Sequence, residues 1–305
     1  MRYTRQLLCC LIFAAALAQA SWAWWSEGHE VIDRAAGSVL PSDMPEFFLK
    51  GTDTIASYSM EPDLWTGRDL PALRSSESLN HYLDLELLGG RELPRTRDEF
   101  LALCCEIKLP PSSVGALPYT IQEWHDRLAV AFAEHRKWPD DKAVQAKILY
   151  IAGVLGHYTG DAGQPLHCTL DYDGRTNPDG SSPRTGIHLK MDALPGQLAL
   201  DPEEVAKGVK AEAVEDIFAR ALAAINESHK RVDRVYKLED KLPPVVGPIE
   251  GKLDEDVRRL ALDCVRTGAE LTATAWHSAW VKSLNVAVPE WYRPVAAGSP
   301  EGPLE

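Results

Sequence analysis

The most apolar segment that follows the first 23 residues runs from Asp140 to Ala162, and it carries a histidine and an aspartate near its end. Its length and composition predict a buried helix. His157 and Asp161 lie four residues apart, so a helix places them on one face, one turn from each other. Burying an imidazole and a carboxylate without partners is costly. The fold must therefore bring other polar groups, or a metal ion, to these two side chains.

Helical periodicity dominates the rest of the chain, and strand signals are scarce. Asp201 begins one such segment as a helix cap, because a proline and two glutamates follow it. We predict an all-α single domain of long helices with functional loops over residues 24–292, and a flexible Pro- and Gly-rich tail over residues 293–305. The segments with the clearest helical pattern are Thr120–Trp138, Asp140–Ala162, Asp201–Leu238 and Leu253–Leu284.

The first 23 residues have the pattern of a cleavable signal peptide. Arg2 and Arg5 precede an apolar run from Leu7 to Ala18, and small residues stand at Ser21 and Ala23. The run is shorter than the roughly 20 residues that a spanning helix needs. We predict cleavage after Ala23, a secreted or periplasmic protein, and no membrane span.

The chain is acidic, with a net charge of −13 that becomes −15 without the signal segment, which holds two arginines and no acid. Such a charge argues against broad binding to duplex DNA through lysines and arginines. If the protein handles phosphates, the positive charge must be local, and metal ions are the obvious source.

Four cysteines lie beyond the signal segment. Their spacing is not that of a cysteine zinc site, and an exported protein can hold disulfides. A Cys168–Cys264 bridge, or a bridge from either of these to Cys104 or Cys105, stays open.

Histidines and carboxylates recur at spacings that suit metal binding. His167 follows Asp161 closely, and His188 and Asp192 are again four residues apart. Histidine and carboxylate ligands without cysteine suit zinc sites with open catalytic positions. Several zinc ions close together are suited to phosphate ester hydrolysis. Further candidates are His29, Asp63, His81 and Asp84, whereas His125, His135, His229 and His277 fit no motif and are predicted to be ordinary helix residues.

In these residues the chain resembles the nuclease branch (nuclease S-one/P-one) of the zinc-dependent phospholipase C and single-strand nuclease superfamily. That family has an N-terminal Trp in W-x-x-x-G-H, then an Asp and a His, then H-x-x-G-D-x-x-Q-P-L-H and H-x-x-x-D. The same order stands here as WWSEGH (Trp24–His29, with Trp25 second), Asp63, His81, HYTGDAGQPLH (His157–His167) and HLKMD (His188–Asp192).

The resemblance implies three zinc ions. It also implies a metal-bridged water as the nucleophile, oriented by Asp63, and 5′-nucleotide products, with 3′-nucleotidase activity in some members. Its third ion would need the free α-amine of Trp24, which only cleavage after Ala23 supplies. By motif position the ligands would be Asp63, His81, His157 and Asp161 for the first ion, His167, His188 and Asp192 for the second, and Trp24, His29 and Asp161 for the third.

The substrate implied is single-stranded nucleic acid or nucleotides, and no protein partner is implied. Tyr82 would stack on a base, with Asp84 beside it and Asn177 at a base edge. Gly186 and Met191 depart from the family, which has Asn and Trp at these positions, so the base pocket would differ from that of the family.

Two other functions compete with this prediction. One is a zinc-dependent phospholipase C, against which the W-x-x-x-G-H spacing and Asp192 in place of glutamate favour a nuclease. The other is a non-catalytic secreted zinc-binding protein, which would have no need to keep every ligand.

Overall fold

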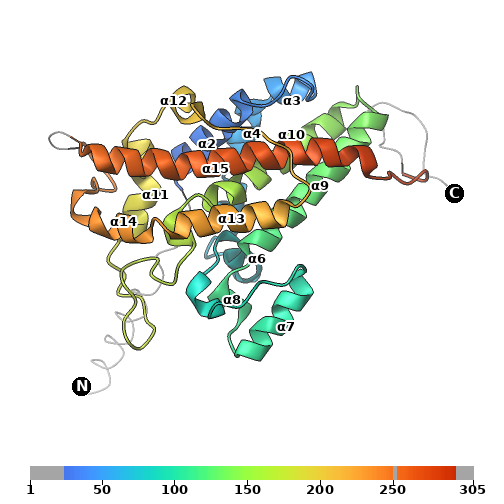
Figure 1. Cartoon of the computed structure of the whole chain (residues 1–305). Coiled ribbons are helices and arrows are strands. Elements are labelled where there is room, and N and C mark those ends of the chain that lie inside the picture. The colour runs from blue at the N-terminus through green and yellow to red at the C-terminus, as the bar shows by residue number, and fades with distance from the viewer. Residues whose placement is uncertain (1–23, 250–252, 293–305) are drawn as a thin grey trace, which may run out of the picture.

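A computed structural model describes residues 24–249 and 253–292 (Figure 1). The predicted signal peptide and tail lie outside these ranges. Within them the chain forms helices and no β-strand, so the predicted all-α class is confirmed. The α-helices are α2 (Ser26–Ser38), α3 (Glu46–Lys50), α4 (Thr52–Tyr58), α5 (Glu61–Trp65), α6 (Pro71–Glu77), α7 (Arg97–Ile107), α8 (Pro111–Val114), α9 (Leu117–Lys137), α10 (Lys142–Asp161), α11 (Ile187–Gln197), α12 (Pro202–Ala206), α13 (Ile217–His229), α14 (Val232–Lys237) and α15 (Glu255–Lys282).

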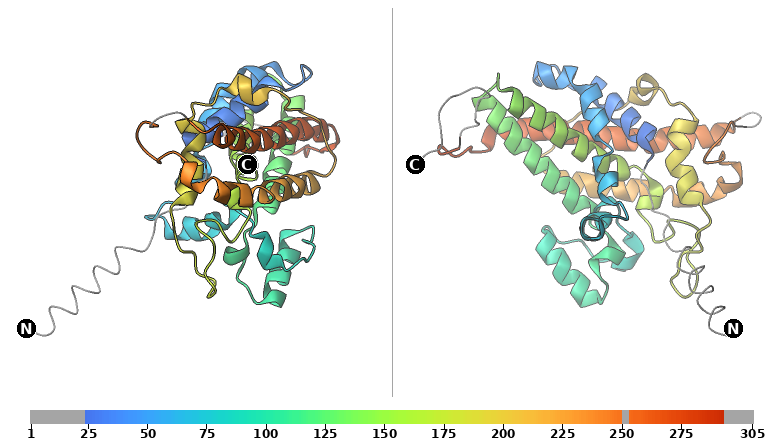
Figure 2. Two further views of the ribbon diagram at one scale, coloured as in Figure 1. Left: turned by 60° about the vertical axis from the view of Figure 1, so that its left-hand side comes forward. Right: turned by 180° about the vertical axis from the view of Figure 1, so that it is seen from behind.

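Short 3₁₀ turns link some of these helices, and two of them matter for the site: η1 (Ser78–His81) and η3 (Pro165–His167). Helix α15 runs the length of the molecule in Figure 1, with α13 beneath it. The rear view in Figure 2 shows α9 and α10 side by side, and α10 also packs on α15 and α4. Within the described ranges, no helix combines the length and apolarity that crossing a membrane requires.

Helix α10 begins where the sequence predicts and becomes the centre of the structure. The Asp141 carboxylate caps it by accepting from the backbone N–H groups of Ala143 and Val144, at 2.8 and 3.2 Å. Every residue from Ala152 to Asp161 is buried. The last three turns of α10 therefore carry His157 and Asp161 through the interior.

Three helices meet at Gly160. A Cβ atom at this position would lie 2.9 Å from Nδ1 of His29 on α2. On the other side, a Cβ atom at Gly268 of α15 would lie 3.2 Å from the Gly160 Cα. Because both residues lack a Cβ, α2 and α15 approach α10 closely, and His29 reaches the level of Asp161.

The prediction of one helix over Asp201–Leu238 is wrong, since this segment forms α12, α13 and α14. Gly208, just after α12, has φ +87°, a left-handed conformation that a helix cannot continue through. Helix α13 then begins directly after Asp216, which caps it by accepting a hydrogen bond from the Ala219 N–H at 2.9 Å. A turn at Lys230 and Arg231 separates α13 from α14.

None of the disulfides that the sequence left open is formed, because all four described cysteines are free. Cys264 lies in α15 among buried apolar side chains. The Cys168 thiol contacts the Gln164 carbonyl at 3.5 Å. Cys104 and Cys105 lie on α7, at the lower edge of the view in Figure 1.

The close packing of α4 on α10 can be tested at Gly153. A Cβ atom there would lie 2.5 Å from the Ile55 carbonyl oxygen, which is backbone and cannot move aside. Overpacking typically costs about 1–3 kcal/mol, whereas alanine gains about 1 kcal/mol of helix propensity over glycine. Gly153→Ala should therefore lower the free energy of unfolding in urea, by up to about 2 kcal/mol.

Ala146→Gly, on the exposed face of the same helix, is the matched control. It should cost only the helix propensity, about 1 kcal/mol. A rise in stability for Gly153→Ala would contradict the close approach of α4.

Candidate metal centre

Buried histidine and aspartate side chains gather around the end of α10. Within each of three groups the potential ligand atoms lie within 4.8 Å of one another. The groups are Asp63, His81 and His157; His167, His188 and Asp192; and His29, His157 and Asp161. The structure thus brings together, from six separate helices and turns, all eight side chains that the resemblance assigns to zinc.

In the second group the hydrogen bonds define which nitrogen carries the proton. Nδ1 of His167 lies 2.8 Å from the His81 carbonyl, and Nδ1 of His188 lies 3.2 Å from the Tyr172 carbonyl. A carbonyl only accepts, so each Nδ1 carries a hydrogen, and in the neutral ring each Nε2 presents a lone pair. The two Nε2 atoms face each other at 3.2 Å, and Oδ2 of Asp192 lies 3.2 Å from that of His188.

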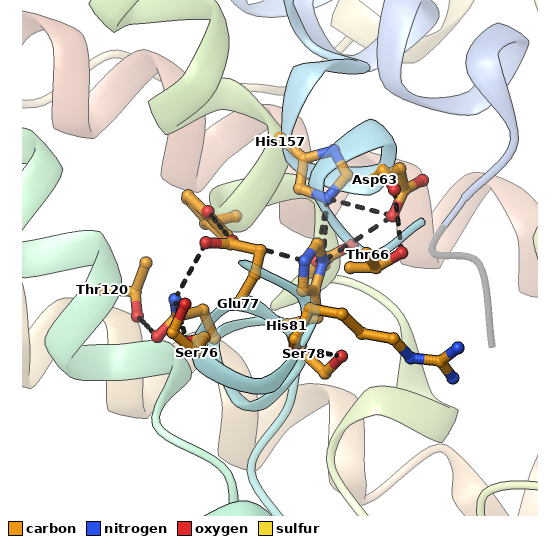
Figure 3. A network of polar contacts seen from close by, with 12 residues as sticks. Asp63, Thr66, Ser76, Glu77, Ser78, His81, Thr120 and His157 are labelled. Atoms are coloured by element: carbon orange, nitrogen blue, oxygen red, sulfur yellow. Dashed lines mark hydrogen bonds and ion pairs between the residues drawn. The ribbon is translucent and has the colours of Figure 1, made fainter. Parts of the chain in front are cut away.

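The first group also contains an imidazole that donates to a backbone carbonyl and turns its other nitrogen toward the cluster. Nδ1 of His157 donates to the Ser59 carbonyl at 2.6 Å, which leaves Nε2 as an acceptor. That Nε2 lies 3.0 Å from Nδ1 of His81 and 3.4 Å from Oδ2 of Asp161. Asp63 closes the group, with Oδ1 3.7 Å from Nε2 of His157 (Figure 3).

These separations fit a shared metal ion. Lone pairs that face each other repel unless a proton or a cation lies between them. Two ligands about 2.0–2.1 Å from a tetrahedral zinc are about 3.3–3.4 Å apart. The nearest ligand atoms are 3.2 Å apart in the second group and 3.0 Å apart in the first, where the Asp63 oxygen lies 3.7 and 3.8 Å from the two imidazoles. The residues therefore fit zinc in donor type, burial and spacing.

Asp161 lies between the groups and divides its oxygens among them. Its Oδ2 faces His81 at 3.1 Å and His157, whereas its Oδ1 lies 3.6 Å from Nε2 of His29. Neither ring nitrogen of His29 has a hydrogen-bond partner in the described part of the chain, and Oδ1 of Asp161 has none either. Leaving such buried atoms unsatisfied costs about 1–3 kcal/mol each, so a third cation would stabilise this side of the cluster.

Trp24 lies beside the C-terminal end of α10. Its side chain is fully buried, and Nε1 donates to the Gly160 carbonyl at 3.0 Å, one residue before Asp161. The next residue, Trp25, donates its N–H to the Asp192 carbonyl at 3.1 Å. The structure thus brings Trp24 close to Asp161, and its role as a ligand through its own amine stays a prediction.

Burial and neighbouring charges shift the pKa of several side chains in the cluster. Burial raises the pKa of the Asp63 and Asp192 carboxyls. Burial also opposes charge on His81, but the carboxylates of Asp161, Glu77 and Asp63 outweigh it and raise the pKa of His81 to about 10. Burial lowers the pKa of His167 to about 4. The cluster thus holds a proton in its interior at neutral pH, in the place where a divalent cation would fit.

A pocket of about 510 Å³ opens onto this cluster through His81, His167 and His188. Such a volume suits a small ligand or a segment of a polymer. Tyr82 and Asp84 line it, and their contact with a substrate stays a prediction. The Tyr82 hydroxyl donates to the Ser112 carbonyl at 2.5 Å, which holds the ring at the pocket wall.

Asn177 is not among the residues that line the pocket. It is exposed, and its amide donates to the Ser181 hydroxyl at 3.1 Å. Its neighbours Thr176 and Gly180 line the pocket instead. A role for Asn177 at a base edge stays a prediction that would require this loop to move.

Sequence reasoning missed several polar residues at the site. Arg74 lines the pocket, and its guanidinium has no ion-pair partner among the residues that the structure describes. Tyr172 supplies a second aromatic ring to the same pocket. Gln164 donates to Oδ1 of Asp192 at 2.6 Å, and its place inside the HYTGDAGQPLH motif was the available signal. Arg74 and Tyr172 lie in loops and short helices without a motif.

No protein-family model matches the chain, and no curated protein matches its sequence. Among solved structures, an alpha toxin from Clostridium absonum is similar, with 14% identity over 86% of this chain and 67% of the toxin, at a TM-score of 0.47. An alpha toxin from an avian strain of Clostridium perfringens is similar with 13% identity over 85% of this chain and 65% of the toxin, at a TM-score of 0.46. The chain thus spans about two thirds of the length of each toxin.

The raised pKa of His81 predicts proton release on metal binding. With a pKa of about 10, His81 is protonated in the metal-free protein at pH 7.5, and a metal ligand must give up its proton. Zinc titrated into the metal-free protein should therefore displace about one proton from His81. Calorimetric titrations in two buffers of different ionisation enthalpy measure this number. Identical heats in both buffers would contradict the prediction.

Proposed function

We propose that the protein is a zinc-dependent phosphodiesterase that hydrolyses single-stranded nucleic acid to 5′-nucleotides. The observation that carries this proposal is the set of buried imidazole nitrogens and carboxylate oxygens that converge beside an open pocket, several of them without a hydrogen-bond partner among the described residues. By position, Asp63, His81, His157 and Asp161 would hold one zinc ion, His167, His188 and Asp192 a second, and Trp24, His29 and Asp161 a third. Zinc held there would polarise a phosphoryl oxygen, lower the pKa of bound water and stabilise the leaving oxygen.

The chain's own residues would orient the reactants. Oδ2 of Asp63 has no hydrogen-bond partner among the described residues and can accept a hydrogen bond from the attacking water. Asp63 is buried, but it shares its group with His81, which lines the pocket. The Arg74 guanidinium at the pocket wall would bind a phosphate oxygen. A positive charge confined to the pocket, such as that of Arg74, is consistent with the negative net charge of the chain.

Two aromatic rings favour a nucleic acid as the substrate. Tyr82 and Tyr172 both line the pocket that reaches the cluster. Stacking of a base on an aromatic ring contributes about 1–3 kcal/mol. Serine and threonine hydroxyls at the same wall, from Thr66, Ser78 and Ser182 among others, can bind sugar or phosphate oxygens.

A phospholipase C is the second candidate, and one feature of the surface favours it. Leu64, Leu70 and Leu73 are 60, 51 and 40% exposed on α5 and α6 and the turn between them. Thr66 and Arg74, from the same stretch, line the pocket. Exposed leucines at the mouth of a phosphate-binding pocket would suit contact with a lipid surface.

The two candidates are separated by assaying one zinc-loaded preparation against single-stranded DNA, RNA and phosphatidylcholine. We expect cleavage of DNA or RNA to products with a 5′-phosphate, identified by chromatography. The activity should be lost with a chelator and restored by zinc. Cleavage of the lipid alone would replace the nuclease with a phospholipase C. Zinc binding without any hydrolysis would indicate a non-catalytic zinc-binding protein.

The position of Asp161 between the groups predicts an unequal loss of metal. Asp161→Ala should remove about two zinc ions per chain, because its two oxygens face different groups. His188→Ala should remove only about one. Metal analysis of both variants after dialysis measures the difference, with circular dichroism as the check on folding. Equal losses would contradict the shared role of Asp161.

A further inference from the structure

His81 is oriented differently from the other histidines around the pocket. His157, His167 and His188 turn Nε2 toward the cluster and donate from Nδ1 to a backbone carbonyl. His81 instead turns Nδ1 toward the cluster, 3.1 Å from Oδ2 of Asp161 and 3.0 Å from Nε2 of His157. Its Nε2 therefore points away from the other ligands and needs a partner outside the cluster.

The polar atom opposite this nitrogen belongs to Glu77. Oε1 of Glu77 lies 3.5 Å from Nε2 of His81, and no described residue offers that nitrogen a closer partner. Glu77 ends α6 and His81 ends the 3₁₀ turn η1, so the two side chains are four residues apart on adjoining turns. Figure 3 shows Glu77 and Asp63 on opposite sides of the His81 ring.

Glu77 is itself held in place from two sides. It is 8% exposed, and the buried Tyr158 hydroxyl donates to the same Oε1. The Asn80 amide donates to Oε2 at 3.3 Å. Tyr158 follows His157 directly on α10, so one end of this contact is fixed by the helix that carries the cluster.

The support continues outward to α7 and α9. Oδ1 of Asn80 accepts from the Thr120 hydroxyl at 2.9 Å, and Arg97 donates to Thr120 at 3.0 Å. Arg97 also contacts both carboxylate oxygens of Glu123, at 2.7 and 3.2 Å. The Glu77 carboxylate is therefore held by contacts other than the one to His81.

We propose that Glu77 is a positioning residue that accepts the Nε2 hydrogen of His81 and so keeps the Nδ1 lone pair aimed at the metal cluster. A neutral imidazole carries one N–H, so an acceptor at Nε2 selects the form in which Nδ1 is free to bind a cation. A carboxylate acceptor also makes the opposite nitrogen a stronger donor to metal than a carbonyl does. This inference rests on the proposed function only in that the cluster binds zinc.

Glu77 is not a further ligand in this arrangement. The two nitrogens of an imidazole point in different directions, and Glu77 faces the one opposite the cluster. It also belongs to none of the three groups whose ligand atoms converge. Its effect must therefore pass through the ring of His81.

The test begins with the wild-type protein loaded with zinc. Long-range ¹H–¹⁵N correlation spectra distinguish a histidine that carries its hydrogen on Nε2 from one that carries it on Nδ1. We expect His81, identified by the resonance that disappears in His81→Asn, to carry its hydrogen on Nε2, and His157, His167 and His188 to carry theirs on Nδ1. A spectrum in which His81 has the same form as these three would overturn the proposal.

The second measurement uses Glu77→Gln, which keeps the size of the side chain and removes its charge. Loss of such a partner typically weakens metal binding about 10–100-fold, and we expect this loss for one zinc ion, measured by competition with a chromophoric chelator. Glu86→Gln is the matched control, because Glu86 accepts from Thr169 and His229 and contacts no ligand. Zinc affinity should be unchanged in that variant.

A merely structural role for Glu77 would give a different result. In that case, Glu77→Gln would lower the urea stability of the metal-free protein and leave zinc affinity unchanged, which would overturn the proposal.

The outcome of this test is also separable from the proposed function. A protein that binds zinc but cleaves no phosphodiester would refute the enzyme, while its histidine spectrum would still decide the role of Glu77. Absence of zinc binding would refute both.

Discussion

The structure depends on imidazole nitrogens and carboxylate oxygens that converge in the interior with few hydrogen-bond donors between them. Nε2 of His167, Nε2 of His188 and Oδ2 of Asp192 face one another, and a similar set surrounds Asp161. The effective penalty for burying an ion is several kcal/mol even after relaxation, and a whole domain is stable by only about 5–15 kcal/mol. A cluster of this size is tolerable only if cations or protons compensate it, and this requirement explains most of the surrounding architecture.

The helices hold the residues of the cluster in place, and hydrogen bonds from behind orient their side chains. Carbonyls of Ser59, His81 and Tyr172 each accept a hydrogen from one imidazole and so turn its other nitrogen inward. Gln164 holds Asp192, and Glu77 faces His81. Three of these five contacts come from backbone carbonyls, and a carbonyl can only accept, so each defines which nitrogen of its ring carries the hydrogen.

The fold and the centre of the site were largely predictable from sequence, but the rim of the pocket was not. The apolar run before His157, together with the spacing to Asp161 and His167, predicted a buried helix that carries metal ligands. Helix α10 is buried and brings His157 and Asp161 to the cluster. The break at Gly208 was missed, because the helical pattern of side chains continues on both sides of it. Arg74 and Tyr172 belong to no motif, and only the fold brings them to the pocket.

The sequence by itself determined the residue types, their spacing along helices and the helical class. These follow from local periodicity and from the cost of burying charged groups. Only the tertiary structure decided which nitrogen of each histidine faces the cluster, that Asp161 lies between the groups, and that Glu77 stands behind His81. Orientation depends on partners such as the Ser59 carbonyl, 98 residues from His157 along the chain. A spacing rule along one helix carries no information about such a partner.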